Sequence, residues 1–140
     1  MSRHRPPPRR ANAAIEFVLM LPMMLLLLGG IVDGSLFLVD RHAAVRAARD
    51  GTRVGASVVE PPPATGDLIE AKAKLFAERS LTSAGIVPDA VMAEWHTDDD
   101  GWSYITLTVI VPHRALFGRY SPFNREIIHS FTMLSQEQGI

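Results

Sequence analysis

The residues of this chain that could do chemistry are few, and the densest group of them is His96 with Asp98, Asp99 and Asp100. Imidazole nitrogens and carboxylate oxygens bind metal ions, so a cation site could form here. The group is followed by Gly101, however, and Asp and Gly are favoured in hairpin turns for backbone reasons alone. A calcium site also needs more oxygen ligands at an ordered spacing. We therefore expect a solvated turn, with no metal and no cofactor.

The other groups that could act in catalysis are scattered along the chain. His42, His113 and His129 have no serine nucleophile or acid at an obvious pairing distance in the sequence, and cysteine is absent. No glycine-rich loop of the phosphate-binding type opens a helix after a strand. We therefore expect that the protein is not an enzyme and contains no disulfides.

The balance of charge excludes one class of partner. The 140 residues include 14 Lys and Arg against 15 Asp and Glu, which gives a formal net charge of −1. A nucleic-acid-binding domain gathers basic residues on one face, whereas most of the arginines here are divided between two segments that flank an apolar run. We expect no nucleic-acid partner.

Glu16 is the acid whose position is most informative, because it directly precedes the uncharged run from Phe17 to Val32. From Ile15 to Val32, eleven residues are Leu, Ile, Val or Phe, and they favour insertion into a bilayer by about 3 to 6 kcal/mol. A carboxylate costs about 2.5 to 3.5 kcal/mol at the bilayer centre and less near an interface. The apolar residues outweigh this cost, so we expect a transmembrane segment over about residues 15–38.

The charges that flank this run predict its orientation. The arginines before it, which no acid accompanies, are Arg3, Arg5, Arg9 and Arg10. The arginines after it alternate with acids, so the positive-inside rule places the N-terminus in the cytoplasm and the residues after about Leu38 outside. A cleaved signal peptide is the alternative, but Gly30, Gly34 and Ser35 form only a poor cleavage site for it.

Breaks in the sequence pattern divide the chain into four parts. We expect a basic cytoplasmic tail, or leader, over residues 1–11 and a long helix over 12–58. A proline-rich linker follows over 59–66, because the residue before a proline is disfavoured in a helix. Residues 67–140 then form one small extracytoplasmic domain, near the size at which a single core is just sufficient.

The small domain is expected to begin with a helix. Asp67 and Glu70 have the spacing of a capping box, and Gly85 with Pro88 would end the helix. Its apolar stripe is expected to consist of Leu68, Ile69, Ala71, Leu75 and Phe76.

Alternation with a period of two then predicts three strands. The first includes Val91, Ala93 and Trp95, and the second includes Ile105, Leu107, Val109 and Val111 and ends at Pro112. The third runs from about Glu126 to Leu134, with its register left open because Ile127 and Ile128 are both apolar. We expect Trp95 and Trp102 to pair across the first hairpin. The expected fold is α+β, with a long N-terminal transmembrane helix, a short second helix and a three-stranded antiparallel sheet.

Small residues recur along the long helix at a spacing of four. Gly30 and Gly34 form a small-xxx-small pair, which permits close packing of helices in lipid. Ala43, Ala47, Gly51 and Gly55 continue the spacing. These residues could pack against helices of other subunits, or their outer part could pack against the chain's own domain.

Four features follow one another along the N-terminal half: the start Ala13-Ala14-Ile15-Glu16-Phe17, the Leu- and Pro-containing apolar run, Asp33 at its exit, and the segment Ala48-Arg49-Asp50-Gly51-Thr52-Arg53. In these features the sequence resembles the TadE-like (TadE/TadF) pseudopilin family of tight-adherence pilus systems. The resemblance covers residues 11–58 well and the remainder loosely.

The resemblance implies cleavage by a prepilin-type peptidase on the cytoplasmic side of the apolar helix. The family pattern makes Glu16 the fifth mature residue, so Ala11 would precede the cut and Asn12 would become the N-terminus. A glycine usually precedes the cut, and Ala11 departs from that pattern, so an uncut anchor stays open. In such a system the terminal ammonium of a neighbouring subunit could neutralise Glu16, beside Phe17, and fix the register of the subunits.

The resemblance further implies a minor pilin or pseudopilin of the bacterial inner membrane. Its partners would be other pilin or pseudopilin subunits, the pilus or secretion assembly machinery and a prepilin peptidase. The alternative is a permanently anchored extracytoplasmic binding module with no role in filaments.

Overall fold

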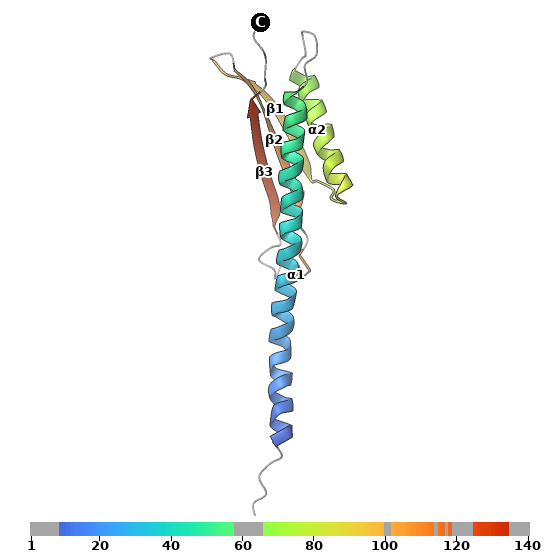
Figure 1. Ribbon diagram of the computed structural model, residues 1–140, viewed down its shortest axis with the longest axis vertical. Helices are drawn as coiled ribbons and strands as arrows, with labels where there is room; N and C mark the ends of the chain where they lie inside the picture. The colour runs from blue at the N-terminus through green and yellow to red at the C-terminus, as the bar shows by residue number, and fades with distance from the viewer. Residues whose placement is uncertain are drawn as a thin grey trace, which may run out of the picture.

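A computed structural model of the chain describes residues 9–57, 66–99, 102–113, 115–116, 118 and 125–134, with side chains from residue 13 onward. Over these ranges the elements follow the order α1, α2, β1, β2, β3 (Figure 1). The two helices and the three-stranded antiparallel sheet confirm the expected α+β class. The tail before Arg9 and most of the expected proline-rich linker lie outside the described residues.

Helix α1, Arg9–Ala56, has 48 residues and runs through Pro22 without interruption. It begins at Arg9 rather than near Asn12, directly after the prolines at positions 6–8, because a residue that precedes a proline is disfavoured in a helix. Its N-terminal part extends away from the rest of the molecule as a single rod, and its C-terminal part lies along the sheet (Figure 1).

The N-terminal part of α1, up to about Val39, projects from the domain and is apolar and exposed. Within Ala13–Ala56, a window of 18 residues has a mean hydropathy of 2.4 and no buried residue. Large apolar side chains that face outward continue from Ile15 as far as Val39. By length and composition, α1 can therefore cross a membrane once.

The remaining elements form the small domain. Helix α2 is Gly66–Ser83, and the strands are β1 Ala90–Thr97, β2 Ser103–Pro112 and β3 Glu126–Leu134. The sheet has the order β1-β2-β3, so β2 lies in the centre. Leu107 of β2 pairs with Ala93 of β1 and with Phe131 of β3.

The core lies between one face of the sheet and the two helices. Strand β2 alternates between buried and half-buried residues along its whole length, as the period of two predicted. Its fully buried residues pack with small residues of both helices, and the group consists of Ile105, Leu107, Val109 and Val111 with Ala44, Ala47, Ala48, Ala73 and Ala77. The outer part of α1 therefore contributes to the domain's core, and the domain extends beyond residues 67–140.

Helix α2 differs from the sequence expectation in the face that it buries. Its buried residues are Ile69, Ala73, Ala77 and Leu81, whereas Leu68, Leu75 and Phe76 are each more than 40 % exposed. The expected stripe was therefore wrong except at Ile69. Alanines face α1 because the two helices lie too close for larger side chains, and the larger residues are displaced to the outer surface.

Two further expectations about side-chain placement are now settled. In β3, Ile127 is buried and Ile128 is 63 % exposed, which fixes the register that the sequence left open. The expected Trp95–Trp102 pair was wrong. Trp95 lies opposite Ile105, and Trp102, which directly precedes β2, is 63 % exposed.

Candidate functional site

The projecting part of α1 carries the residues that the sequence assigned to processing and assembly. Ala11 and Asn12 lie within α1, but their side chains are not described. Glu16 is exposed, and Phe17 is 60 % exposed beside it. An exposed carboxylate at the base of an apolar helix is accessible to a charged group from another polypeptide, and its burial in lipid without such a group would be costly.

The small residues of α1 divide into two groups with different surroundings. A Cβ atom built on Gly30 would meet nothing within 4 Å, and Gly34 is half-buried. Ala47 and Gly51 are buried in the chain's own core. The outer part of the stripe therefore packs against the chain's own domain, whereas Gly30 faces outward and is open to another helix.

The outer glycines let α1 approach both α2 and the sheet closely. A Cβ atom on Gly51 would lie 2.6 Å from Leu107 Cδ2 and 3.0 Å from the Ala73 carbonyl oxygen. A Cβ atom on Gly55 would lie 2.6 Å from Ile105 Cδ1 and 3.0 Å from Ala73 Cβ. Contacts this short exclude larger side chains, so these glycines set the distance between the layers.

A polar cluster joins the end of β2 to α1. His113 Nδ1 lies 2.6 Å from Asp40 Oδ2, and the His113 side chain is only 2 % exposed. A carboxylate only accepts hydrogen bonds, so Nδ1 is the donor and carries the proton. Phe37, one turn before Asp40, meets the imidazole edge-on with ring centroids 5.3 Å apart.

A second contact lies two turns further toward the projecting part of α1. The Leu116 N–H donates to Asp33 Oδ1 at 2.8 Å, and Asp33 is 1 % exposed. Asp33, Phe37 and Asp40 follow an i, i+4, i+7 spacing, so they lie on one face of α1. Sequence reasoning noted the acids and His113 separately and missed the cluster. The spacing of the acids was the available signal, but their partners are 73 and 83 residues away in the chain.

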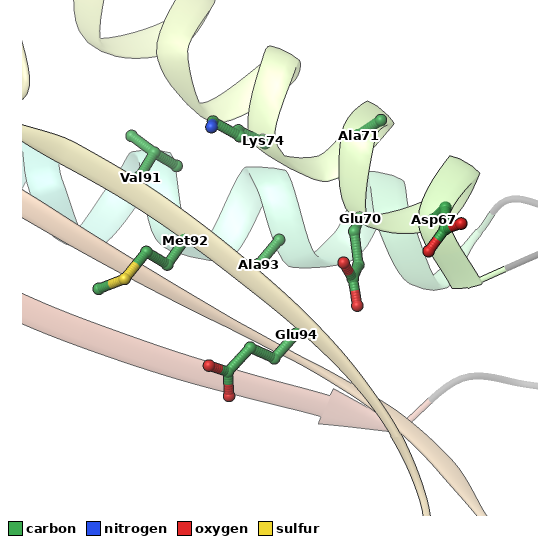
Figure 2. Close-up of a pocket in the computed structure, with 8 residues that line it drawn as sticks. All are labelled: Asp67, Glu70, Ala71, Lys74, Val91, Met92, Ala93 and Glu94. Carbon is green, nitrogen blue, oxygen red and sulfur yellow. The ribbon is translucent and has the colours of Figure 1, made fainter.

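An open groove runs between α2 and the outer edge of β1. Figure 2 shows Glu70 extending from α2 toward β1, with Asp67 and Lys74 on the same helix. Glu70 Oε1 accepts a hydrogen bond from the Trp95 N–H at 2.7 Å. The Glu70 carboxylate therefore binds the edge of β1 instead of forming the expected capping box with Asp67. Helix α2 also begins at Gly66, one residue before Asp67.

Three of the residues first considered as metal ligands lie at the end of β1 and just after it, namely His96, Asp98 and Asp99, whereas Asp100 lies outside the described residues. His96 Nε2 lies 3.3 Å from Glu94 Oε2, and both side chains are exposed. Asp98 Oδ1 accepts the Asp99 N–H at 2.8 Å, and the Asp98 N–H donates to the Trp102 carbonyl at 2.8 Å. Among the residues that the structure describes, no three His, Cys, Asp or Glu side chains lie close enough together to hold a metal ion.

Comparison with known proteins gives a family match that falls on α1. Residues 12–53 match the model of the family described as TadE-like protein. The match begins at Asn12, includes Glu16 and Asp33, and ends among the small residues that pack against α2. No curated protein and no solved structure matches the chain.

Proposed function

We propose that the chain is a minor pilin or pseudopilin, a structural component of pilus or secretion-filament assembly at the bacterial inner membrane. The match of residues 12–53 to the TadE-like family carries this proposal. It supports a protein associated with the Tad pilus system, and the matched segment is the exposed apolar helix together with its junction to the domain.

The proposed mechanism is association of helices without catalytic turnover. Helix α1 spans the membrane with its N-terminus in the cytoplasm, as the unaccompanied N-terminal arginines indicate, and the α+β domain lies outside. Glu16 pairs with an ammonium group on a neighbouring subunit. This pairing lowers the cost of holding the carboxylate in an apolar bundle and favours one register of the helices.

The outward surfaces of the chain supply its other contacts with pilin or pseudopilin subunits. Gly30 leaves one face of the membrane segment open to a close neighbour, as small residues do between helices in lipid. The apolar side chains of Leu68, Leu75 and Phe76 face outward on α2. The proposed partners are other subunits and the assembly machinery, with a prepilin peptidase acting between Ala11 and Asn12.

The decisive experiment compares Glu16→Ala with Leu19→Ala in cells that form the pilus. Both positions are exposed in the same part of α1, so both variants should insert into membranes normally. We expect Glu16→Ala to abolish most filament formation and Leu19→Ala to leave it close to normal, measured as pilus protein in the sheared surface fraction. Normal filaments with Glu16→Ala would contradict the assigned role of Glu16.

Mass spectrometry of the mature N-terminus separates the proposal from the alternative of a permanently anchored binding module. A mature chain that begins at Asn12 supports prepilin-type processing. A chain that keeps Met1 or Ser2, together with unchanged filaments when the gene is deleted, supports the anchored module.

A further inference from the structure

Two residues that follow β2, His113 and Leu116, contact α1 at defined heights. His113 contacts Asp40, and the Leu116 N–H is bonded to Asp33. Asp33 and Asp40 are seven residues apart, or about 10 Å along the helix axis. His113 therefore lies beside α1 at the base of the domain, and Leu116 lies further toward the projecting part of α1.

The height of Asp33 relative to a bilayer follows from the length of the helix. Asp33 is seventeen positions after Glu16 in the sequence, which is about 26 Å at 1.5 Å per residue. The hydrocarbon core of a bilayer is about 30 Å thick. When Glu16 is at one boundary of this core, Asp33 is close to the other.

Apolar side chains continue past Asp33 on the outside of α1. Leu36, Leu38 and Val39 are 44 %, 50 % and 61 % exposed. A helix surface that stays apolar over another turn and a half is expected where it still faces lipid. The outer interface of the bilayer therefore includes the stretch from Asp33 to about Asp40, and Leu116 lies at its inner end.

Leu116 itself faces outward at this height. Its side chain is 64 % exposed while its N–H is held by the buried carboxylate of Asp33, and the neighbouring Ala115 is buried against the protein. The backbone hydrogen bond and the buried alanine hold the backbone at Leu116 beside α1, so the exposed side chain lies at the height of Asp33.

We propose that Leu116 is a membrane contact, inserted into the leaflet on the domain's side of the bilayer, and that Asp33 holds it there. The partner is the lipid surface, at the boundary between headgroups and acyl chains. The proposal rests on the proposed function in requiring that α1 spans a membrane. It gives the domain a second attachment to the bilayer, beside the spanning part of α1, and it gives Asp33 a role in positioning that attachment.

Single cysteines test this, because the natural chain has none. Leu116→Cys is labelled with bimane in the full chain reconstituted in vesicles, and quenching is measured with lipids brominated near the headgroup and with iodide in the water. Leu134→Cys is the matched control, since Leu134 is 60 % exposed at the far end of β3. Leu28→Cys, at a position 57 % exposed within the span, reports insertion of α1.

We expect the label at position 116 to lose most of its emission to brominated lipid and little to iodide, and the label at 134 to behave in the opposite way. If iodide quenches the label at 116 as strongly as the label at 134, the proposal for Leu116 is overturned. In that case, lipid quenching of the label at 28 would still show that α1 spans the membrane. Protection of 116 from both quenchers means that protein covers it, which also overturns the proposal. Absence of lipid quenching at 28 would instead contradict the spanning helix.

A pair of variants at Asp33 tests the positioning role in the same assay. Asp33→Asn keeps an acceptor for the Leu116 N–H and should retain lipid quenching of the label at 116. Asp33→Ala removes the acceptor and should lower that quenching while the label at 28 remains quenched. Equal quenching in the two variants would show that Asp33 does not hold Leu116 at the membrane.

Discussion

Gly51 of α1 lies so close to Leu107 of β2 that a Cβ atom on the glycine would be 2.6 Å from Leu107 Cδ2. The same atom would also lie 3.0 Å from the Ala73 carbonyl oxygen and 3.1 Å from Ala77 Cβ, both in α2. The flexible end of the Leu107 side chain could move aside, but the Ala73 carbonyl oxygen is part of the α2 backbone and could not. The packing of α1 against both α2 and β2 therefore depends on the absence of a side chain at position 51.

Gly51→Val should destabilise the domain by about 1 to 3 kcal/mol, the usual cost of overpacking a filled core. The free energy of unfolding can be followed in detergent by tryptophan fluorescence, since half-buried Trp95 packs against the core. Gly30→Val is the matched control on the same helix, because a Cβ atom there meets nothing within 4 Å. Equal stability of the two variants would contradict the close packing at Gly51.

Asp40→Ala should destabilise the domain by about 1 to 3 kcal/mol, because it leaves the buried His113 imidazole without its acceptor. The imidazole has no second partner to compensate, since Nε2 is buried without a hydrogen bond in the part of the chain that the structure describes. The measurement is the urea midpoint of the domain, with the denaturant slope checked for a constant value.

Glu94→Ala is the control for Asp40→Ala, since it removes the carboxylate partner of a different histidine. The Glu94 and His96 side chains are 67 % and 46 % exposed and 3.3 Å apart. Surface pairs of this kind contribute little, so the change should stay within about 0.5 kcal/mol. A loss for Glu94→Ala as large as that for Asp40→Ala would show that burial of the His113 contact is not what matters.

The sequence predicted the elements well because each of them rests on local patterns. The alternation from Ile105 to Val111 matches the buried positions of β2 one for one, and the apolar run after Glu16 forms the projecting part of α1. Hydrophobic periodicity and the positions of the prolines can be recognised in the sequence without knowing how the elements pack, so they predicted these elements correctly.

The parts that the sequence could not predict depend on distances between elements. The face of α2 was misassigned because its large residues, Leu75 and Phe76, are excluded by the close approach of α1 at Gly51 and Gly55. Likewise, Asp33 could be interpreted as an acid at the exit of an apolar run, but its partner Leu116 is 83 residues away.

Glu70 protects the edge of β1, and this leads to a prediction that a local probe can check. The Trp95 N–H points away from β2 and donates to Glu70 Oε1 at 2.7 Å, so a side chain of α2 takes the place of a further strand. Glu70→Ala should speed amide hydrogen exchange at Trp95 and lower stability by about 1 to 2 kcal/mol.

Glu70→Gln is the informative control, because its amide oxygen can accept the same hydrogen bond without a negative charge. We expect slow exchange at Trp95 to persist in Glu70→Gln, whereas Glu70→Ala exposes the amide to water at the groove shown in Figure 2. Exchange at Leu107, in the central strand, should change only by the common loss of global stability. If Trp95 and Leu107 accelerate by the same factor in Glu70→Ala, the carboxylate supports the fold as a whole and does not specifically cover this edge.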